Sequence, residues 1–251
     1  MRHIAFAAAF VLAVAASAQE KAKPTEPIAT DRPDFTESGL VVPAGWLQTE
    51  TGFTYQFLRH GSNFGAPEAL LRYGLNSRAE LRLGLPNFGV QRLGGDKFSG
   101  FGDTYLGTKL QIGPLKNGDD LSLILAAFLP TGAASQSSDS VDPDVKLCYS
   151  RPLTPRTSLS VMEYAAYTTD ERGRTLVFQQ TASVGFELTE KFAAFTEYAG
   201  TFGARLAPDH VAHAGFTYQP TANSQYDIHF GFSMNGPERA PFVAAGYSFR
   251  F

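Results

Sequence analysis

The sequence has almost no cysteine and, beyond its first residues, no long apolar run. A single cysteine, Cys148, in 251 residues excludes an internal disulfide. After residue 18 no segment approaches the roughly 18 consecutive apolar residues that a membrane-spanning helix needs, which excludes a helical membrane protein. The formal net charge of −3 lacks the basic excess of a nucleic-acid-binding protein, so we expect no nucleic-acid partner.

The first residues have the three parts of a secretory signal peptide. Arg2 gives a positive start, an apolar run follows over residues 4–16, and Ala16-Ser17-Ala18 offers a small-residue cleavage site. An apolar run of about 13 residues is too short to anchor a helix in a membrane. No cysteine stands directly after the cleavage site, and Cys148 is too far along the chain to carry the lipid of a lipoprotein. We therefore predict a signal peptide over residues 1–18 and export of a mature chain with 20 basic and 24 acidic side chains.

The mature chain divides into a polar leader and a long patterned region. Residues 19–45 are polar and contain proline, which predicts a leader without strands. From Trp46 to residue 251, apolar and polar side chains alternate in segments of about ten residues, separated by Gly, Pro, Asn or Asp. In residues 78–85, for example, Leu81 and Leu83 alternate with Glu80 and Arg82. This spacing is typical of the strands of an outer-membrane β-barrel.

We count about 12 such segments, an even number, as bacterial single-chain barrels have. One of them, residues 157–167, is irregular, because Leu159, Val161 and Glu163 share one phase while Met162 and Tyr164 share the other. A β-bulge within this segment would reconcile the two phases.

Longer connections over residues 86–98 and 130–142 alternate with short turns at residues 76–77 and 189–190. Short turns belong on the periplasmic side of an outer-membrane barrel, which predicts that both termini are periplasmic. Aromatic residues near the predicted strand ends, such as Trp46 and Tyr167, fit the two interfaces of a membrane.

The fold class is therefore all-β, a transmembrane antiparallel up-and-down β-barrel. In hydrocarbon every backbone N–H and C=O needs a partner within the protein, so a sheet can span a membrane only by closing on itself. A secreted β-sandwich is the alternative, with its charged face turned to water and its apolar face to a shared core. We predict the outer membrane of a Gram-negative bacterium as the location, with its lipid as one partner.

Several motifs resemble one known family. The stretch Thr30-Asp31-Arg32-Pro33-Asp34-Phe35-Thr36-Glu37-Ser38, ahead of a first strand at Gln48-Thr49-Glu50, resembles the opening of outer-membrane barrels labelled as transporters of the MetA-pathway of phenol degradation. Leu129-Pro130-Thr131-Gly132 and the closing Gly246-Tyr247-Ser248-Phe249-Arg250-Phe251 are similar as well. The resemblance covers essentially the whole mature chain, and it implies a barrel that passes small, often aromatic or hydrophobic, molecules.

The alternation along each predicted strand places charged side chains of both signs on the face that we expect to line the lumen. A polar passage whose charges bias the permeant is one interpretation, and a lumen filled by neutralising ion pairs is the other. The numbers of positive and negative lumen-facing side chains are nearly equal, which predicts weak selectivity between anions and cations. A barrel of about 12 strands is expected to have a narrow bore. The candidate lumen-lining residues are Glu50, Arg72, Arg78, Glu80, Arg82, Asp103, Lys109, Lys146, Glu187, Glu197, Asp227 and Arg250.

The leader offers a second candidate site. Asp31, Arg32, Asp34 and Glu37 make it too polar to lie in lipid. It could fold into the lumen as a plug, with Arg32 paired to inward carboxylates, or it could be a periplasmic tether.

The sequence gives weak support to catalysis or metal binding. His60-Gly61-Ser62 places a histidine near a serine, as in barrel hydrolases, but a loop rich in Gly and Ser produces this pattern readily. His213 and His229 both face inward in neighbouring strands but lack a full ligand set. We therefore predict no enzyme activity, no cofactor and no metal.

The function predicted from the sequence is a passive outer-membrane channel or transporter for small molecules. A structural barrel with a blocked lumen is the alternative, and a barrel hydrolase is the third possibility. The last strand, residues 243–251, ends in an aromatic residue, as in other barrels that the outer-membrane assembly machinery recognises. We expect that machinery to be a partner, whereas the permeant is not specified by the sequence.

Overall fold

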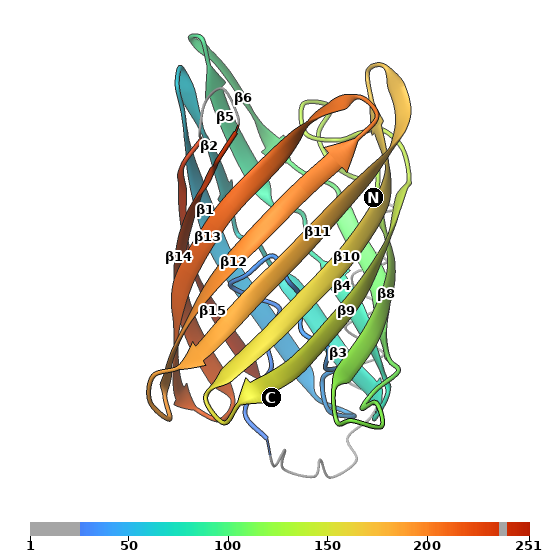
Figure 1. Cartoon of the computed structure of the whole chain (residues 1–251). Coiled ribbons are helices and arrows are strands. Elements are labelled where there is room, and N and C mark those ends of the chain that lie inside the picture. The colour runs from blue at the N-terminus through green and yellow to red at the C-terminus, as the bar shows by residue number, and fades with distance from the viewer. Residues whose placement is uncertain (1–25, 236–239) are drawn as a thin grey trace.

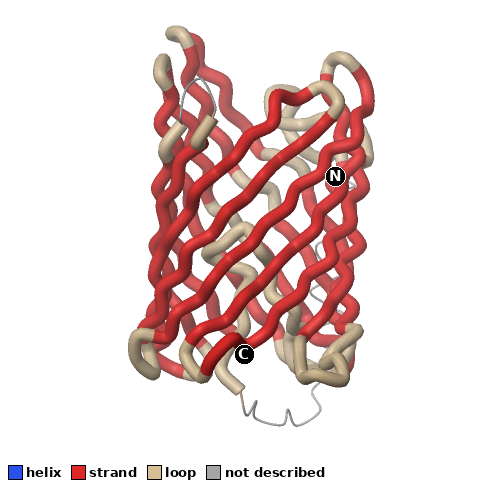
Figure 2. The backbone as a smooth tube through the Cα atoms, viewed as in Figure 1, coloured by secondary structure: helices blue, strands red, loops and turns tan. Residues whose placement is uncertain are grey.

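A computed structural model describes residues 26–235 and 240–251, which form one antiparallel sheet closed on itself (Figures 1 and 2). The pairing of β1 with β15 closes the sheet. Among the described residues no helix has the length and hydrophobicity needed to cross a membrane. The predicted signal peptide lies outside the described residues. The strands are β1 (Leu47–Leu58), β2 (Gly61–Ala66), β3 (Leu70–Asn76), β4 (Ala79–Gly84), β5 (Phe88–Leu93), β6 (Asp96–Phe101), β7 (Thr104–Gln111), β8 (Asp120–Leu129), β9 (Asp142–Thr154), β10 (Thr157–Asp170), β11 (Gly173–Glu187), β12 (Phe192–Gly203), β13 (Leu206–Thr221), β14 (Ser224–Ser233) and β15 (Phe242–Arg250).

Three neighbouring strands of the barrel are each divided into two elements. β2 and β3, β4 and β5, and β6 and β7 are separated at residues 67–69, 85–87 and 102–103. Pro67 and Pro86 cannot donate a backbone hydrogen bond to the sheet, which accounts for two of these breaks. Counted with each divided pair as one strand, the barrel has twelve strands, which confirms the predicted number.

The prediction of a long loop over residues 86–98 is wrong. Residues 88–93 and 96–101 are β5 and β6, joined by Gly94 and Gly95 in the positive-φ conformation that glycine adopts readily. Together with β2 they extend beyond the rest of the wall at one end of the barrel (Figure 1).

The two ends of the barrel differ less in their connections than the sequence predicts. The end that carries Phe251, here called the C-terminal end, has two-residue turns but also the long connection 112–119. The opposite end has two-residue turns at 171–172 and 204–205 beside the longer connection 130–141. Loop length alone therefore does not distinguish the two sides of the membrane.

Side chains alternate between the two faces of the wall, as the period of two requires. The outward side chains are apolar and exposed, among them Phe53, Leu106, Leu125, Leu147, Phe178, Phe216, Ile228 and Phe230. The inward side chains are largely polar and buried, among them Glu50, Arg72, Glu80, Arg82, Lys109, Thr181, Glu197 and Asp227. An apolar exterior around a polar interior is the arrangement of a membrane barrel and the reverse of a sandwich in water.

The predicted bulge between the two phases of residues 157–167 is wrong, because residues 158–166 pair regularly on both sides. β10 pairs with β11 without interruption from Thr157 to Asp170, and its pairing with β9 is irregular only between Thr157 and Ser158. Met162 and Ala166 are buried on the inner face, whereas Glu163 is exposed on the outer face. The residues of the two phases therefore lie on the two opposite faces of one regular strand.

Candidate functional site: the N-terminal segment inside the barrel

Residues 28–44 enter the barrel at its C-terminal end, rise to mid-height and return (Figure 1). At the entry the N–H of Ile28 donates to the carbonyl of Ala222, between β13 and β14, at 2.8 Å. At the exit Ala44 forms a parallel bridge with Gly74 of β3. We call residues 28–44 the luminal segment, because they occupy part of the lumen and meet the inward side chains of the wall.

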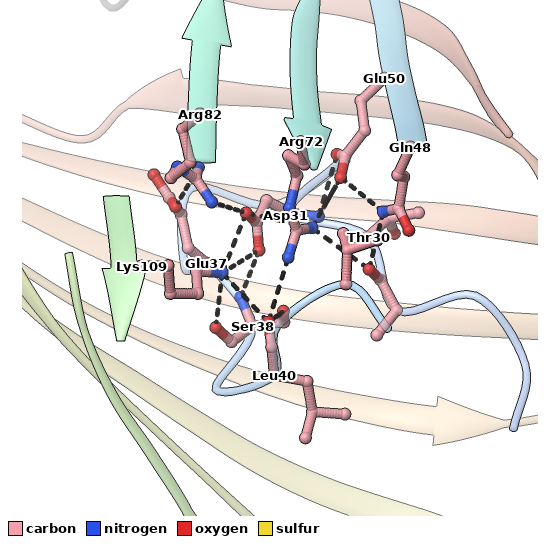
Figure 3. A network of polar contacts seen from close by, with 12 residues as sticks. Thr30, Asp31, Glu37, Ser38, Leu40, Gln48, Glu50, Arg72, Arg82 and Lys109 are labelled. Carbon is pink, nitrogen blue, oxygen red and sulfur yellow. Dashed lines mark hydrogen bonds and ion pairs between the residues drawn. The ribbon is translucent and has the colours of Figure 1, made fainter. Parts of the chain in front are cut away.

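Asp31 is the centre of the contacts on one side of the lumen (Figure 3). Its carboxylate lies 2.7 Å from Nη1 of Arg82, 3.2 Å from Nη1 of Arg72 and 2.9 Å from Nζ of Lys109. All four side chains are buried. Burial alone would raise the pKa of Asp31, but Arg72, Lys109 and Arg82 hold it well below its ordinary value. Asp31 is therefore an ionised carboxylate shared by three cations.

The wall around Asp31 has an excess of positive charge. Arg72 joins its two carboxylates, with Nε 2.8 Å from Glu80 and Nη1 2.8 Å from Glu50. Arg82 also lies 2.9 Å from Glu80, and the buried carboxylate of Asp144 stands two residues from Lys146 on β9. Among the described residues, Lys109 and Lys146 form their ion pairs with Asp31 and Glu37 of the luminal segment. This basic wall consists of Arg72, Arg82, Lys109 and Lys146 with Glu50 and Glu80, from β1, β3, β4, β7 and β9.

Glu37 makes the second link between the luminal segment and the basic wall. One oxygen accepts a hydrogen bond from Nη2 of Arg82 at 2.6 Å, and the other pairs with Nζ of Lys146. The ammonium group of Lys146 also lies 5.7 and 5.6 Å from the ring centres of Tyr105 and Tyr164, within the range of cation–π attraction. Lys146 is therefore held in place from three directions.

Arg32 points away from the basic wall, towards carboxylates on the other strands. Its Nη1 lies 3.1 Å from Glu68 and its Nη2 lies 3.2 Å from Asp227. The guanidinium group lies against Gly52 of β1, where an added Cβ would come within 2.5 Å of Nη2. Glycine at this inward position leaves the room that Arg32 occupies. Arg32 therefore pairs with carboxylates on the side of the lumen away from the basic wall.

Glu197 of β12 holds the turn of the luminal segment. It accepts hydrogen bonds from the N–H of Phe35 at 2.9 Å, from the N–H of Thr36 at 2.8 Å and from the hydroxyl of Thr36 at 2.6 Å. Nδ1 of His213 lies 2.7 Å from the same carboxylate, and Nε2 of His213 lies 2.7 Å from Nδ1 of His229. We call Glu197, His213, Asp227 and His229 the acidic wall.

Asp34 lies next to the same carboxylate. Burial, and then the neighbouring charge of Glu197, raise the pKa of Asp34 well above its ordinary value. Of the four predicted plug residues, Asp31, Arg32 and Glu37 thus form ion pairs with the wall, whereas Asp34 faces a like charge.

Phe35 lies between two cavities. Its ring packs on His213 and Phe242, with centroid separations of 4.7 and 6.0 Å. The cavities measure about 640 and 530 Å³, and both contact Gln136 in the connection between β8 and β9. They lie between the luminal segment and the end of the barrel opposite Phe251. The larger cavity is lined by charged and aromatic side chains, including Arg32, Glu68, Tyr105, Phe128, Asp142 and Lys146.

The structure brings most of the predicted lumen-lining residues to the luminal segment, but not all. Arg250 faces inward near the C-terminal end, with Nε 2.9 Å from Oδ1 of Asn223. Asp103 lies between β6 and β7 and accepts hydrogen bonds from the backbone of residues 131, 132 and 138. Arg78 is exposed in the β3–β4 turn, and Glu187 is exposed at the end of β11. These four residues do not contact the luminal segment's charged side chains.

Some contacts of this site have no signal in the sequence. Thr36 donates to Glu197 and lies 2.6 Å from the hydroxyl of Thr181, yet the leader has no periodicity that would point to Thr36. Gln48, by contrast, is in the inward phase of β1, and its amide donates to the carbonyl of Ala29 at 2.9 Å. Alternation could have identified Gln48 as a luminal residue, although not its partner.

The candidate serine and histidine lie apart from these contacts. His60 is in the β1–β2 turn, and Ser62 is in β2, paired with Phe57 and Arg92. Neither residue lines the two cavities. Among the described residues, no group of three or more His, Cys, Asp or Glu side chains is arranged to hold a metal ion.

The sequence matches the profile of a known family, described as "Putative MetA-pathway of phenol degradation", over residues 30–251. The chain belongs to this family. The match begins at the luminal segment and includes the entire barrel, so the family pattern covers both parts of the site. No curated protein matches the sequence.

Solved structures with a similar fold include an outer-membrane channel and two porins. The COG4313 outer membrane channel from Pseudomonas putida F1 superposes with a TM-score of 0.66 at 14% identity, over 92% of this chain and 100% of that one. The NanC porin has a TM-score of 0.58 at 10% identity, over 81% and 98% of the two chains. The KdgM porin has a TM-score of 0.55 at 10% identity, over 80% and 99%. At these identities the similarity establishes the barrel fold.

Proposed function

We propose that this protein is an outer-membrane channel of a Gram-negative bacterium through which small molecules diffuse, and that the luminal segment is its plug. The observation that carries the proposal is the charge match between Asp31 and Glu37 and the basic wall. A segment whose carboxylates pair with buried cations of the wall is bound there more tightly than a neutral tether would be. The family membership and the channel and porin neighbours support the same function.

The permeant that we propose is a small aromatic or hydrophobic molecule. The larger cavity, of about 640 Å³, is of the size that accommodates small ligands. Phe35, Tyr105 and Phe128 contribute aromatic surface to its lining. The family description refers to phenol degradation, which agrees with such a permeant. Passage by diffusion requires no cofactor or nucleotide.

The extent of ion pairing also favours a second candidate, a structural barrel whose lumen stays blocked. Planar-bilayer conductance of the mature protein, with and without residues 28–44, separates the two. The channel proposal expects rare openings of the full-length protein and sustained conductance after the deletion. Absence of conductance in both forms would support the blocked barrel. Equal conductance of the two forms would contradict the proposal that the luminal segment is a plug. Heat-dependent migration on gels checks that both forms are folded.

Uptake into liposomes tests the permeant. At about pH 8, where benzoate is ionised and crosses lipid slowly, liposomes that contain the deleted form are expected to take up benzoate faster than a sugar of similar size, with protein-free liposomes as the baseline. Equal rates for the aromatic and the sugar would contradict the proposed preference while leaving the channel function intact.

We propose that the protein catalyses no reaction. The positions of His60 and Ser62, away from both cavities, support this. Hydrolysis of ester or phospholipid substrates by the purified protein, lost on Ser62→Ala, would contradict it.

A further inference from the structure

One polar pair faces outward from the middle of the wall, where the other outward side chains are mostly apolar. Glu163 of β10 and Gln180 of β11 are directly paired in the sheet and exposed. Nε2 of Gln180 lies 3.3 Å from Oε1 of Glu163. Among the described residues, no other Asp or Glu side chain faces outward from the middle of a barrel strand.

The position of the pair places it deep in the hydrocarbon. Glu163 is the seventh of the fourteen residues of β10, and Gln180 is the eighth of the fifteen residues of β11. With a strand tilt of about 40° and a rise of about 3.3 Å per residue, Glu163 lies roughly 15 Å above the foot of β10. The apolar band of such a barrel is about 25 Å tall. The pair therefore lies near its middle.

Lipid cannot satisfy the remaining polar atoms of this pair. The single hydrogen bond leaves Oε2 of Glu163 and the carbonyl oxygen of Gln180 facing hydrocarbon. Polar groups at this depth are costly unless they are hydrogen-bonded, and ionisable ones occur mainly where another protein group meets them. Lipid headgroups and water lie too far away to reach the middle of the membrane.

Two small residues lie beside the pair. Ala165 follows Glu163 on the outer face of β10, and Ala182 follows Gln180 on β11. On β12, Gly200 is paired with Gln180, but Tyr198 and Phe202 lie over it, so the close approach is confined to β10 and β11. Small side chains allow two protein surfaces in a membrane to approach closely, so that polar groups can bond across the contact.

The pair is also complementary to itself. A twofold axis along the membrane normal, between Glu163 and Gln180, would place each Glu163 opposite the Gln180 of a second copy. The amide offers both a donor and an acceptor, and a carboxylic acid group does the same, so two copies would satisfy the atoms that one copy leaves open.

We propose that the outward face of β10–β12 around Glu163 and Gln180 is the interface through which two copies of this chain associate in the membrane. This inference does not depend on the proposed function, because it concerns the lipid-facing side of the wall.

Disulfide cross-linking in native outer membranes tests the interface. Ala182→Cys is expected to give a covalent dimer of this chain. Leu71→Cys, which faces lipid on β3 at the opposite side of the barrel, is the matched control and is expected to stay monomeric. The natural Cys148 is buried on the inner face and contributes no cross-link. Equal yields at the two positions, or a cross-link to a different protein, would overturn the proposal.

Two further changes on the Ala182→Cys background test the cause of association. Replacement of Glu163 and Gln180 by leucine is expected to lower the dimer yield by about tenfold, because the hydrogen bonds across the contact are lost. Ala165→Trp keeps the polar pair but prevents close approach, and a similar loss is expected. Glu163→Gln retains a donor and an acceptor and is expected to preserve the dimer. An unchanged yield in both the leucine and the tryptophan variants would overturn the proposal.

Discussion

The basic wall and the acidic wall bind the same luminal segment by different means. On the basic wall, Asp31 and Glu37 neutralise buried cations of β3, β4, β7 and β9. On the acidic wall, Glu197 receives backbone N–H groups and a hydroxyl, and the only cation of the segment, Arg32, reaches Asp227. Removal of a segment carboxylate leaves buried charges uncompensated, whereas removal of Glu197 leaves mainly unpaired neutral groups. The basic wall should therefore contribute more to plug closure.

The largest effect is expected for Asp31→Asn. Three buried cations would lose the carboxylate that they share, and breaking a buried ion pair in this way typically costs about 3–5 kcal/mol. We expect the open probability in planar bilayers to rise more than tenfold. Asp170→Asn, in the exposed β10–β11 turn region, is the matched control. Equal open probabilities in the two variants would contradict the role of the basic wall.

A smaller effect is expected for Glu197→Gln. The amide oxygen still accepts hydrogen bonds, but the bonds from Phe35 and Thr36 lose the strength that a charged acceptor adds, about 1–2 kcal/mol in all. We expect an increase in open probability below that of Asp31→Asn. Glu187→Gln, at the exposed end of β11, serves as the control. If Glu197→Gln opened the channel more than Asp31→Asn, the order of the two walls would be reversed.

The smallest effect is expected from pH in the neutral range. The pKa values of Asp31 and Glu37 are lowered in the docked segment, despite burial, by Arg82 and the neighbouring cations. Stabilisation from such groups is present above their ordinary values of 3.8 and 4.5 and is lost as pH falls through the lowered values.

Asp34 acts in the opposite sense, because a pKa raised by burial and by Glu197 makes its protonation favour the docked segment as pH falls. We therefore expect single-channel recordings to show no rise in open probability as pH falls from about 8 to 5, and opening only in stronger acid. Opening between about pH 7 and pH 5 would contradict this account, because Asp31 and Glu37 stay ionised in the docked segment throughout that range.

The barrel could be predicted from the sequence because alternation is a local property of each strand. Leu81 and Leu83 against Glu80 and Arg82 assign both faces of β4 without knowledge of any neighbour. The same reasoning fails where pairing with another strand decides whether a segment is a strand or a loop. Residues 86–98 contain Pro86 and three glycines and resemble a loop, yet pairing with β2 makes most of them strands.

Glu163 shows a different limit of prediction from the sequence. Its charge suggested an inward position and hence a bulge, whereas the structure keeps the strand regular and leaves Glu163 facing outward. The partners of the luminal segment were also out of reach, because residues 28–44 have no period that fixes which side chain meets which wall. The charge of Arg32 suggested pairing with inward carboxylates, but only the structure shows that Asp31 and Glu37 meet the basic wall while Arg32 reaches Glu68 and Asp227.

A reversible tether between the luminal segment and the wall tests the plug most directly. The hydroxyls of Thr36 and Thr181 are 2.6 Å apart, so Thr36→Cys with Thr181→Cys can form a disulfide across this contact. In the Asp31→Asn background, we expect the oxidised protein to remain closed in planar bilayers and to open when a reductant is added. Either single cysteine variant should be insensitive to the reductant. Equal conductance of the oxidised and reduced double variant would contradict closure by the luminal segment.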